Sequence, residues 1–145
     1  MLDQERMSIE AACQRLVVAY CHYVDHGEAS RVADLFTRDG VWEAPDVTVQ
    51  GSQSIRDFFH GLDQDKTRMT RHLCSNFQLN EVSTATATGV VYVTLYRHQG
   101  EEGRSTSPLV GPAAVGEYRD QFVHTPDGWR IRHRVAMADF VAQTE

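Results

Sequence analysis

Residues 16–51 read LVVAYCHYVDHGEASRVADLFTRDGVWEAPDVTVQG, and they join the end of a long helix to the start of a second layer of structure. Apolar residues recur at helical spacing as far as Val24, which predicts a first helix with one apolar face. His26-Gly27 then ends this helix, and the apolar residues within 32–36 indicate a short second one. The apolar face consists of Ile9, Ala12, Cys13, Leu16, Val17, Tyr20, Tyr23 and Val24.

Further along the chain the pattern changes from helical to strand-like. Arg38-Asp39-Gly40 predicts a turn, residues 41–44 a short strand, and Ser52 can cap a third helix that runs through Leu62. Alternating apolar and polar residues predict four long strands at 69–82, 85–97, 113–125 and 129–140. Helices that precede strands are typical of an α+β domain. We therefore expect three N-terminal helices against a curved antiparallel sheet, in a cone-shaped fold that encloses a pocket.

The composition predicts a single globular domain over residues 1–145. Of the 145 residues, 41% are hydrophobic and 23% are charged, which is enough apolar material for one core. The net charge of −6, without a basic run, disfavours a nucleic-acid partner or an anionic membrane surface and favours small molecules or proteins. We expect no secretory signal and no membrane span, and the odd number of cysteines fits a reducing cytoplasm.

Four segments together resemble the SnoaL-like branch of the NTF2-like superfamily. They are residues 16–51, followed by RHLCSNFQL at 71–79, GEYRDQF at 116–122 and DGWRIRHRV at 127–135. The resemblance covers nearly the whole chain and implies the cone-shaped α+β fold, together with a homodimer formed through the open face of the sheet. Because this fold hosts dehydratases, isomerases, polyketide cyclases and non-catalytic subunits, the activity depends on the site residues.

Asp25, at the predicted end of the first helix, and His72, in the first long strand, are the leading site residues. His72 shares its side of the strand with Thr70, Cys74 and Asn76, a mixed face that can line a polar pocket. A carboxylate bonded to one imidazole nitrogen fixes the tautomer and leaves the other nitrogen free as a base near neutral pH. The pair predicts proton abstraction, and the alternatives are a surface carboxylate and an ordinary hydrogen-bonded strand histidine.

The resemblance implies further site positions. In family members that eliminate water or hydrogen chloride, an Asp at the end of the first helix pairs with a strand His, and Asp25 and His72 fall at those places. Tyr20 matches a first-helix tyrosine of the dehydratases, and Arg134 matches an arginine in the last strand. The bile acid dehydratases have another pocket aspartate, which is missing here because residues 93–95 are Val-Thr-Leu. Arg134 also shares its strand side with solvent-facing arginines, so it needs a bulge to point inward.

Four other residues are candidates for substrate binding. Asn76 shares the face of His72 and could bind a ligand or pair with a neighbouring side chain. Tyr92 and Tyr118 are predicted on strands that flank the pocket, where aromatic residues also serve as cross-strand packing. Trp42 follows a turn and either lines the pocket or closes one end of the cone as a core anchor.

The sequence predicts neither a metal nor a cofactor. His22 and His26 are four residues apart on a helix, a spacing that can chelate zinc, but no third ligand is near them in the sequence. Gly-rich phosphate loops and a Gly-x-Ser-x-Gly nucleophile elbow are absent from the sequence.

The leading hypothesis for function is a cofactor-independent lyase acting on a small hydrophobic, oxygenated molecule. His72 would take a proton from a carbon beside a carbonyl, Tyr20 would hydrogen-bond an oxygen, and Arg134 would stabilise developing negative charge. One alternative is an isomerase or polyketide cyclase that uses the same pair. Another is a non-catalytic binding or assembly subunit, similar to the small subunits of ring-hydroxylating dioxygenases. The long connection at 99–112 could form a lid or a dimer arm.

Overall fold

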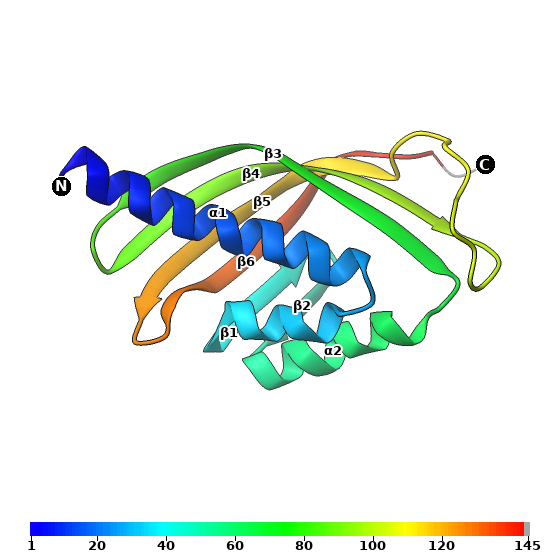
Figure 1. Ribbon diagram of the computed structural model, residues 1–145, viewed down its shortest axis with the longest axis horizontal. Coiled ribbons are helices and arrows are strands. Elements are labelled where there is room, and N and C mark those ends of the chain that lie inside the picture. The colour runs from blue at the N-terminus through cyan, green and yellow to red at the C-terminus, as the bar shows by residue number, and fades with distance from the viewer. Residues whose placement is uncertain (144–145) are drawn as a thin grey trace.

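The computed structural model of this protein describes residues 1–143, which form two α-helices, a 3-10 helix and one six-stranded sheet (Figure 1). The helical segments precede the long strands, as predicted for an α+β fold. Along the chain the elements are α1 (Asp3–Asp25), the 3-10 helix η1 (Ala29–Leu35), β1 (Phe36–Ala44), β2 (Val47–Gln50), α2 (Ser52–Gln64), β3 (Arg68–Val82), β4 (Thr86–Gln99), β5 (Ala114–Thr125) and β6 (Gly128–Val141).

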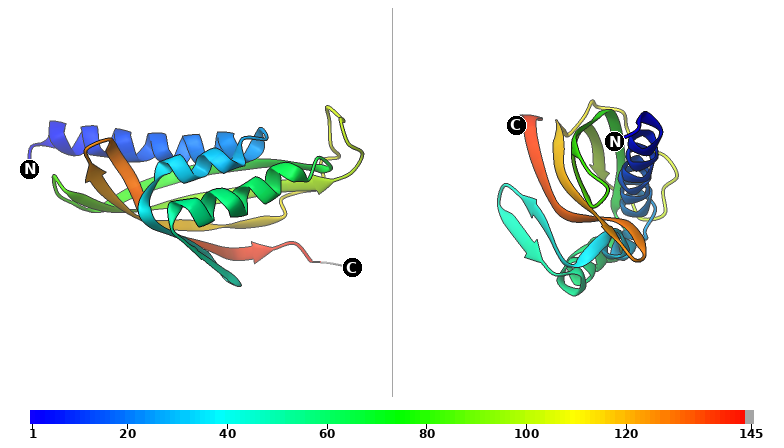
Figure 2. Two further views of the ribbon diagram at one scale, coloured as in Figure 1. Left: turned by 90° about the horizontal axis from the view of Figure 1, so that it is seen from below. Right: turned by 90° about the vertical axis from the view of Figure 1, so that its left-hand side faces the viewer.

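The sheet has the strand order β2-β1-β6-β5-β4-β3, so β2 and β3 are its two edges and it does not close into a barrel. Strands β3 to β6 pair antiparallel in sequence order, whereas β1 pairs parallel with β6. The sheet curves, and both α-helices and η1 lie on the same side of it (Figure 2). This arrangement confirms the predicted cone-shaped fold.

The core lies between α1 and the concave face of the sheet. The apolar face predicted for the first helix is largely buried from Ile9 to Val24, and it packs on both β3 and η1. Burying an aliphatic or aromatic side chain of this size stabilises a fold by about 1.5–3 kcal/mol. This packing fixes the end of α1 against β3 and so determines where Asp25 lies. No helix within residues 1–143 is both long enough and apolar enough to cross a bilayer.

Two local predictions are wrong. The expected turn at Arg38-Asp39-Gly40 lies inside β1, where the pairing with β6 shifts register between Phe36 and Val41. A bulge absorbs the turn residues there, so the chain continues as a strand. The cap of α2 is Gly51 rather than Ser52, because the backbone at this position has φ of 92°, a conformation that glycine adopts without steric cost.

The connection between β4 and β5, residues 100–113, does not cover the main cavity described below. Arg104 attaches it to the sheet by donating hydrogen bonds to the carbonyls of Thr67 and His98, at 2.8 Å each. The Ser107 hydroxyl contacts the sulfur of Met69, which lies on the opposite side of β3 from His72. The segment therefore packs against the convex face of the sheet, and the expectation of a lid over the pocket is not met.

Candidate active site

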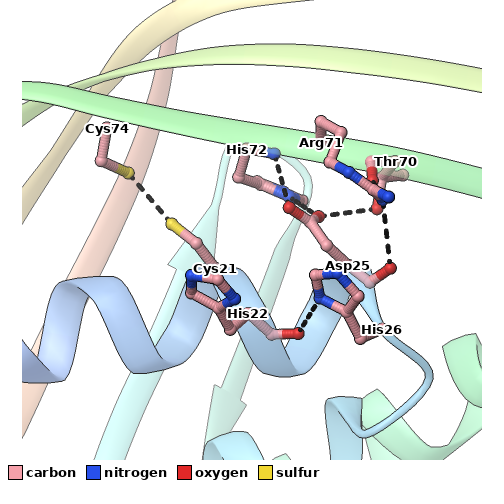
Figure 3. A network of polar contacts seen from close by, with 8 residues as sticks. All are labelled: Cys21, His22, Asp25, His26, Thr70, Arg71, His72 and Cys74. Atoms are coloured by element: carbon pink, nitrogen blue, oxygen red, sulfur yellow. Dashed lines mark hydrogen bonds and ion pairs between the residues drawn. The ribbon is translucent and has the colours of Figure 1, made fainter.

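Asp25 and His72 are in direct contact (Figure 3). Asp25 is the last residue of α1 and His72 lies in β3, and their Oδ1 and Nδ1 atoms are 2.6 Å apart. Their side chains are 5% and 8% exposed, respectively, so solvent screens the contact little. The packing of α1 on β3 thus brings together the two leading residues of the sequence analysis.

The Asp25 carboxylate receives hydrogen bonds on both oxygens. The Thr70 hydroxyl donates to Oδ1 at 2.9 Å, and the backbone N–H of His72 donates to Oδ2 at 2.8 Å. Burial alone would raise the pKa of Asp25, but the hydrogen bonds from His72 and Thr70 outweigh it and hold the pKa below its usual value. These bonds also compensate for a carboxylate at a helix C-terminus, where the helix dipole disfavours negative charge.

His72 is held in one orientation by this carboxylate. Because Asp25 accepts a hydrogen bond from Nδ1, the neutral imidazole carries its proton there and leaves Nε2 with a free lone pair. Among residues 1–143, no group forms a hydrogen bond with Nε2, and the His72 side chain lines a cavity. The geometry suits a general base.

The cavity beside His72 has a volume of about 380 Å³ and is mostly apolar. Its aromatic wall consists of Tyr20, Trp42, Phe58, Phe59 and Tyr118. Its aliphatic wall includes Val24, Leu62, Val93, Leu95 and Met137. Such a chamber fits a small hydrophobic molecule with a few polar groups.

Two tyrosines with neutral hydroxyl groups line the cavity. Tyr20 on α1 accepts a hydrogen bond from Nε1 of Trp42 at 3.1 Å, and its ring lies edge-on to that of Tyr118. Burial raises the pKa of Tyr20 to about 12 and the pKa of Tyr118 well above its ordinary value. Both phenols therefore stay protonated near neutral pH and can donate hydrogen bonds to a bound oxygen. Trp42 both lines the cavity and packs against Phe59.

Arg134 lies behind this wall rather than in it. A bulge opposite Gln121 and Phe122 turns its side chain inward, as the sequence required, and the residue is 0% exposed. Its Nε and one Nη atom each donate to Asp120 at 2.8 Å, and its guanidinium carbon lies 4.4 Å from the Tyr20 ring centre and 4.2 Å from that of Tyr118. Arg134 is therefore not among the residues that line the cavity, and its guanidinium packs instead against the two tyrosine rings that do.

Two predicted binding residues lie outside the cavity. Asn76 has a positive φ of 57° at a bulge where β3 shifts register, so the strand no longer alternates and Asn76 faces solvent instead of sharing the side of His72. Tyr92 is 52% exposed, because buried Val91 and Val93 occupy the inward positions on either side of it. Neither residue is a binding residue of this cavity.

Two charged residues that line the cavity, Arg68 on β3 and Arg97 on β4, were not among the residues predicted from the sequence. The alternation that places His72 inward also places Arg68 inward, four residues earlier on the same strand. Arg97 pairs with Thr70, which lies between these two positions. The inward position of Arg68 could have been predicted from the alternation of residues along β3. The position of Arg97 follows only from the pairing of β4 with β3.

Two of the three free cysteines form a contact beside the dyad. The sulfur atoms of Cys21 on α1 and Cys74 on β3 are 3.2 Å apart, and they form a second contact between these elements (Figure 3). The hydrogen bond with Cys74, together with burial, raises the pKa of the Cys21 thiol. Cys13 is buried elsewhere along the same helix and contributes to the core.

The histidines of the helix end pack on each other. The rings of His22 and His26 are stacked with centres 5.5 Å apart, and Nδ1 of His26 lies 2.9 Å from the His22 carbonyl oxygen (Figure 3). Within residues 1–143, no three His, Cys, Asp or Glu side chains are grouped closely enough to hold a metal ion.

Comparison with known proteins gives a family and a set of similar folds. Residues 5–135 match the family described as SnoaL-like domain, whereas no curated protein matches the sequence significantly. A candidate scytalone dehydratase from Novosphingobium aromaticivorans is 20% identical with a TM-score of 0.82, over 99% of this chain and 93% of that one. LinA is 20% identical with a TM-score of 0.79, over 99% and 95%. A candidate aromatic ring hydroxylase from Novosphingobium aromaticivorans is 24% identical with a TM-score of 0.76, over 92% and 91%.

Proposed function

Because the chain belongs to the SnoaL-like domain family, we propose that it is a cofactor-independent lyase acting on a small hydrophobic, oxygenated molecule. One observation carries the proposal: Nδ1 of His72 is hydrogen-bonded to a buried carboxylate, while the His72 side chain lines an apolar cavity. A base that is oriented, desolvated and next to a substrate-sized cavity is the arrangement that proton abstraction needs.

The proposed reaction is an elimination. Nε2 of His72 takes a proton from a carbon beside a carbonyl, and the electrons of that C–H bond form a double bond as the neighbouring C–O bond breaks. The departing hydroxide takes the proton back from the imidazolium and leaves as water. Tyr20 and Tyr118 donate hydrogen bonds to the carbonyl oxygen as it gains negative charge, and Asp25 stabilises the imidazolium. The buried charge of Arg134 lies behind the two tyrosine rings and supports them.

The same base would also serve an isomerase or a cyclase, in which the carbanion is redirected and no group leaves. The product separates these reactions, since only elimination lowers its mass by one water. The open cavity and the oriented dyad support an enzyme over an assembly subunit, which needs neither.

Proton abstraction can be tested before the natural substrate is identified. A panel of apolar β-hydroxy ketones is incubated with the protein in D₂O, and both deuterium uptake at the carbon beside the carbonyl and loss of water are followed by mass spectrometry. We expect His72→Gln to lower the rate about 10²- to 10⁴-fold, since general base catalysis contributes that much. The matched control is His133→Gln. His133 lies on β6 and is hydrogen-bonded to Glu43 of β1, so this variant should retain the wild-type rate. Equal rates in wild type and folded His72→Gln would contradict the proposal.

A further inference from the structure

The structure places two arginines at one end of the apolar cavity. Arg68 begins β3 and Arg97 lies near the end of β4, and both face the same side of the sheet as His72. In the register of the two strands, Arg97 is opposite Thr70, and Arg68 is two residues from that position. The pair is thus adjacent across the strands.

These two guanidinium groups lack counter-ions within the chain. Among residues 1–143, neither side chain forms a hydrogen bond or an ion pair. Asp65 lies near Arg68, but its carboxylate already accepts hydrogen bonds from Thr67 and Gln99. Burial lowers the pKa of Arg68 and the nearby charge of Arg97 adds to this, while the carboxylates of Asp25 and Asp65 act in the opposite direction without forming an ion pair with Arg68.

Apart from these two arginines, the lining of the cavity within residues 1–143 carries no charged side chain that is always ionised. The other side chains with polar atoms that line the cavity within the described chain are His72, Tyr20, Tyr118 and Trp42, and Nε1 of Trp42 already donates to Tyr20. Arg68 is half-buried, whereas Arg97 is exposed, so this end of the cavity meets solvent. A ligand that fills the cavity therefore has an apolar body at the dyad and one end beside two unpaired cations.

We propose that the substrate is an amphipathic anion whose oxyanion group is bound by Arg68 and Arg97 while its apolar body lies against His72. The inference rests on the proposed function, because it assigns the substrate class of that same site. Along an extended strand, Arg97 is about 7 Å and Arg68 about 13 Å from the level of His72, at roughly 3.3 Å a residue. The oxyanion and the reacting carbon are then separated by several bonds. A planar guanidinium binds carboxylate and phosphate oxygens in pairs, which suits either oxyanion.

Binding of matched probes tests this assignment without turnover. The probes are 5-(naphthalen-2-yl)pentanoate, the corresponding alcohol and the phosphate monoester of that alcohol, and their naphthalene fluorescence reports binding. We expect the wild type to bind at least one anionic probe about tenfold or more tightly than the alcohol, since charged hydrogen bonds contribute about 1.5–3 kcal/mol. The tighter of the two anions identifies the source of the oxyanion, a free acid or a phosphate-bearing carrier.

Single variants identify the residues responsible. Arg68→Gln and Arg97→Gln should each reduce the preference for the anion several-fold, and the double variant should abolish it. Arg132→Gln removes the same charge from an exposed position on β6 and should leave the preference intact. Equal affinity for anion and alcohol in the wild type, no binding of either anion, or an unchanged preference in the folded double variant would overturn the assignment.

The outcome separates this inference from the proposed lyase activity. His72→Gln should keep the anion preference, because the dyad and the arginines contact different parts of the ligand. An anion preference without proton exchange in any assay would refute the lyase and leave the binding assignment standing. Proton exchange that depends on His72, without an anion preference, would refute the binding assignment and leave the lyase proposal standing.

Discussion

At the scale of single residues, the orientation of His72 depends on how completely the Asp25 carboxylate is hydrogen-bonded. Three donors from two residues of β3 bind its two oxygens, and the side chain is 5% exposed. A neutral amide at this position could not accept the same set of bonds, since its nitrogen is a donor. The charge of Asp25 is therefore part of the fold as well as of the proposed chemistry.

This predicts an acid-dependent contribution of Asp25 to stability. Because the folded state holds the pKa of Asp25 below its unfolded value, the carboxylate stabilises the protein above the unfolded pKa, and the contribution is lost as the pH falls through the folded value. Asp25→Asn should lower the free energy of unfolding at about pH 6, and its difference from wild type should shrink towards about pH 3. Urea denaturation across this range measures the difference.

Asp127→Asn is the control for this experiment, because Asp127 is an exposed turn residue whose carboxylate forms no hydrogen bond within the described chain. Its difference from wild type should be small at every pH. A gap between wild type and Asp25→Asn that stays constant or widens on acidification would show that the carboxylate is not selectively stabilised in the folded state.

At the scale of secondary structure elements, two bulges decide which side chains face the helix-covered side of the sheet. In β3 the bulge at Asn76 shifts the inward positions from His72 and Cys74 to Phe77 and Leu79. In β6 the register shift brings Arg134 inward three residues after buried Ile131. Each bulge lengthens one strand by a residue and so exchanges the two faces beyond it.

The bulge in β3 predicts an unusual response to substitution at Asn76. Its φ of 57° is easily adopted by glycine and asparagine but is unfavourable for β-branched residues. Asn76→Gly should leave stability near that of wild type, whereas Asn76→Val should reduce it by about 1–2 kcal/mol. Thermal and urea denaturation give both values. Asn80→Val makes the same change of side chain at an exposed position of the same strand and serves as the control. If Asn80→Val lowers stability as much as Asn76→Val, the effect at Asn76 does not come from its backbone conformation.

At the scale of the whole molecule, the helices cover one face of the sheet and leave the other partly apolar. Leu73 and Tyr92 are each 52% exposed on the convex face of β3 and β4. They lie diagonally across the two strands, since Leu73 pairs with Thr94 and Ser75 with Tyr92. Exposed apolar residues that are neighbours on a sheet favour association with another surface.

The homodimer implied by the family resemblance is therefore predicted to use this face. Sedimentation velocity should give the mass of two chains for the wild type and of one chain for the Leu73→Glu, Tyr92→Glu double variant. Val18→Glu introduces one glutamate at a 54% exposed position on α1, away from the convex face, and should leave the dimer intact. A wild type that sediments as a monomer at micromolar concentration would refute the prediction.

Much of the fold follows from periodicity. The 3.6-residue spacing of apolar residues located α1, and the period of two located β3 to β6 to within two residues at either end. The hairpin of β1 and β2 was harder to predict. Arg38-Asp39-Gly40 has the composition of a turn, although these residues lie inside β1. The β2 strand, four residues long, was not predicted at all.

The sequence by itself determined the fold class, the family and the two residues of the dyad, because each depends on local pattern or on position along an element. Only the tertiary structure decided which other residues share the cavity with them. Bulges moved Asn76 away and Arg134 inward, and strand register brought Arg97 beside Arg68. A pattern of period two predicts facing only while the strand stays regular, and a single inserted residue reverses it without leaving a clear signal in the sequence.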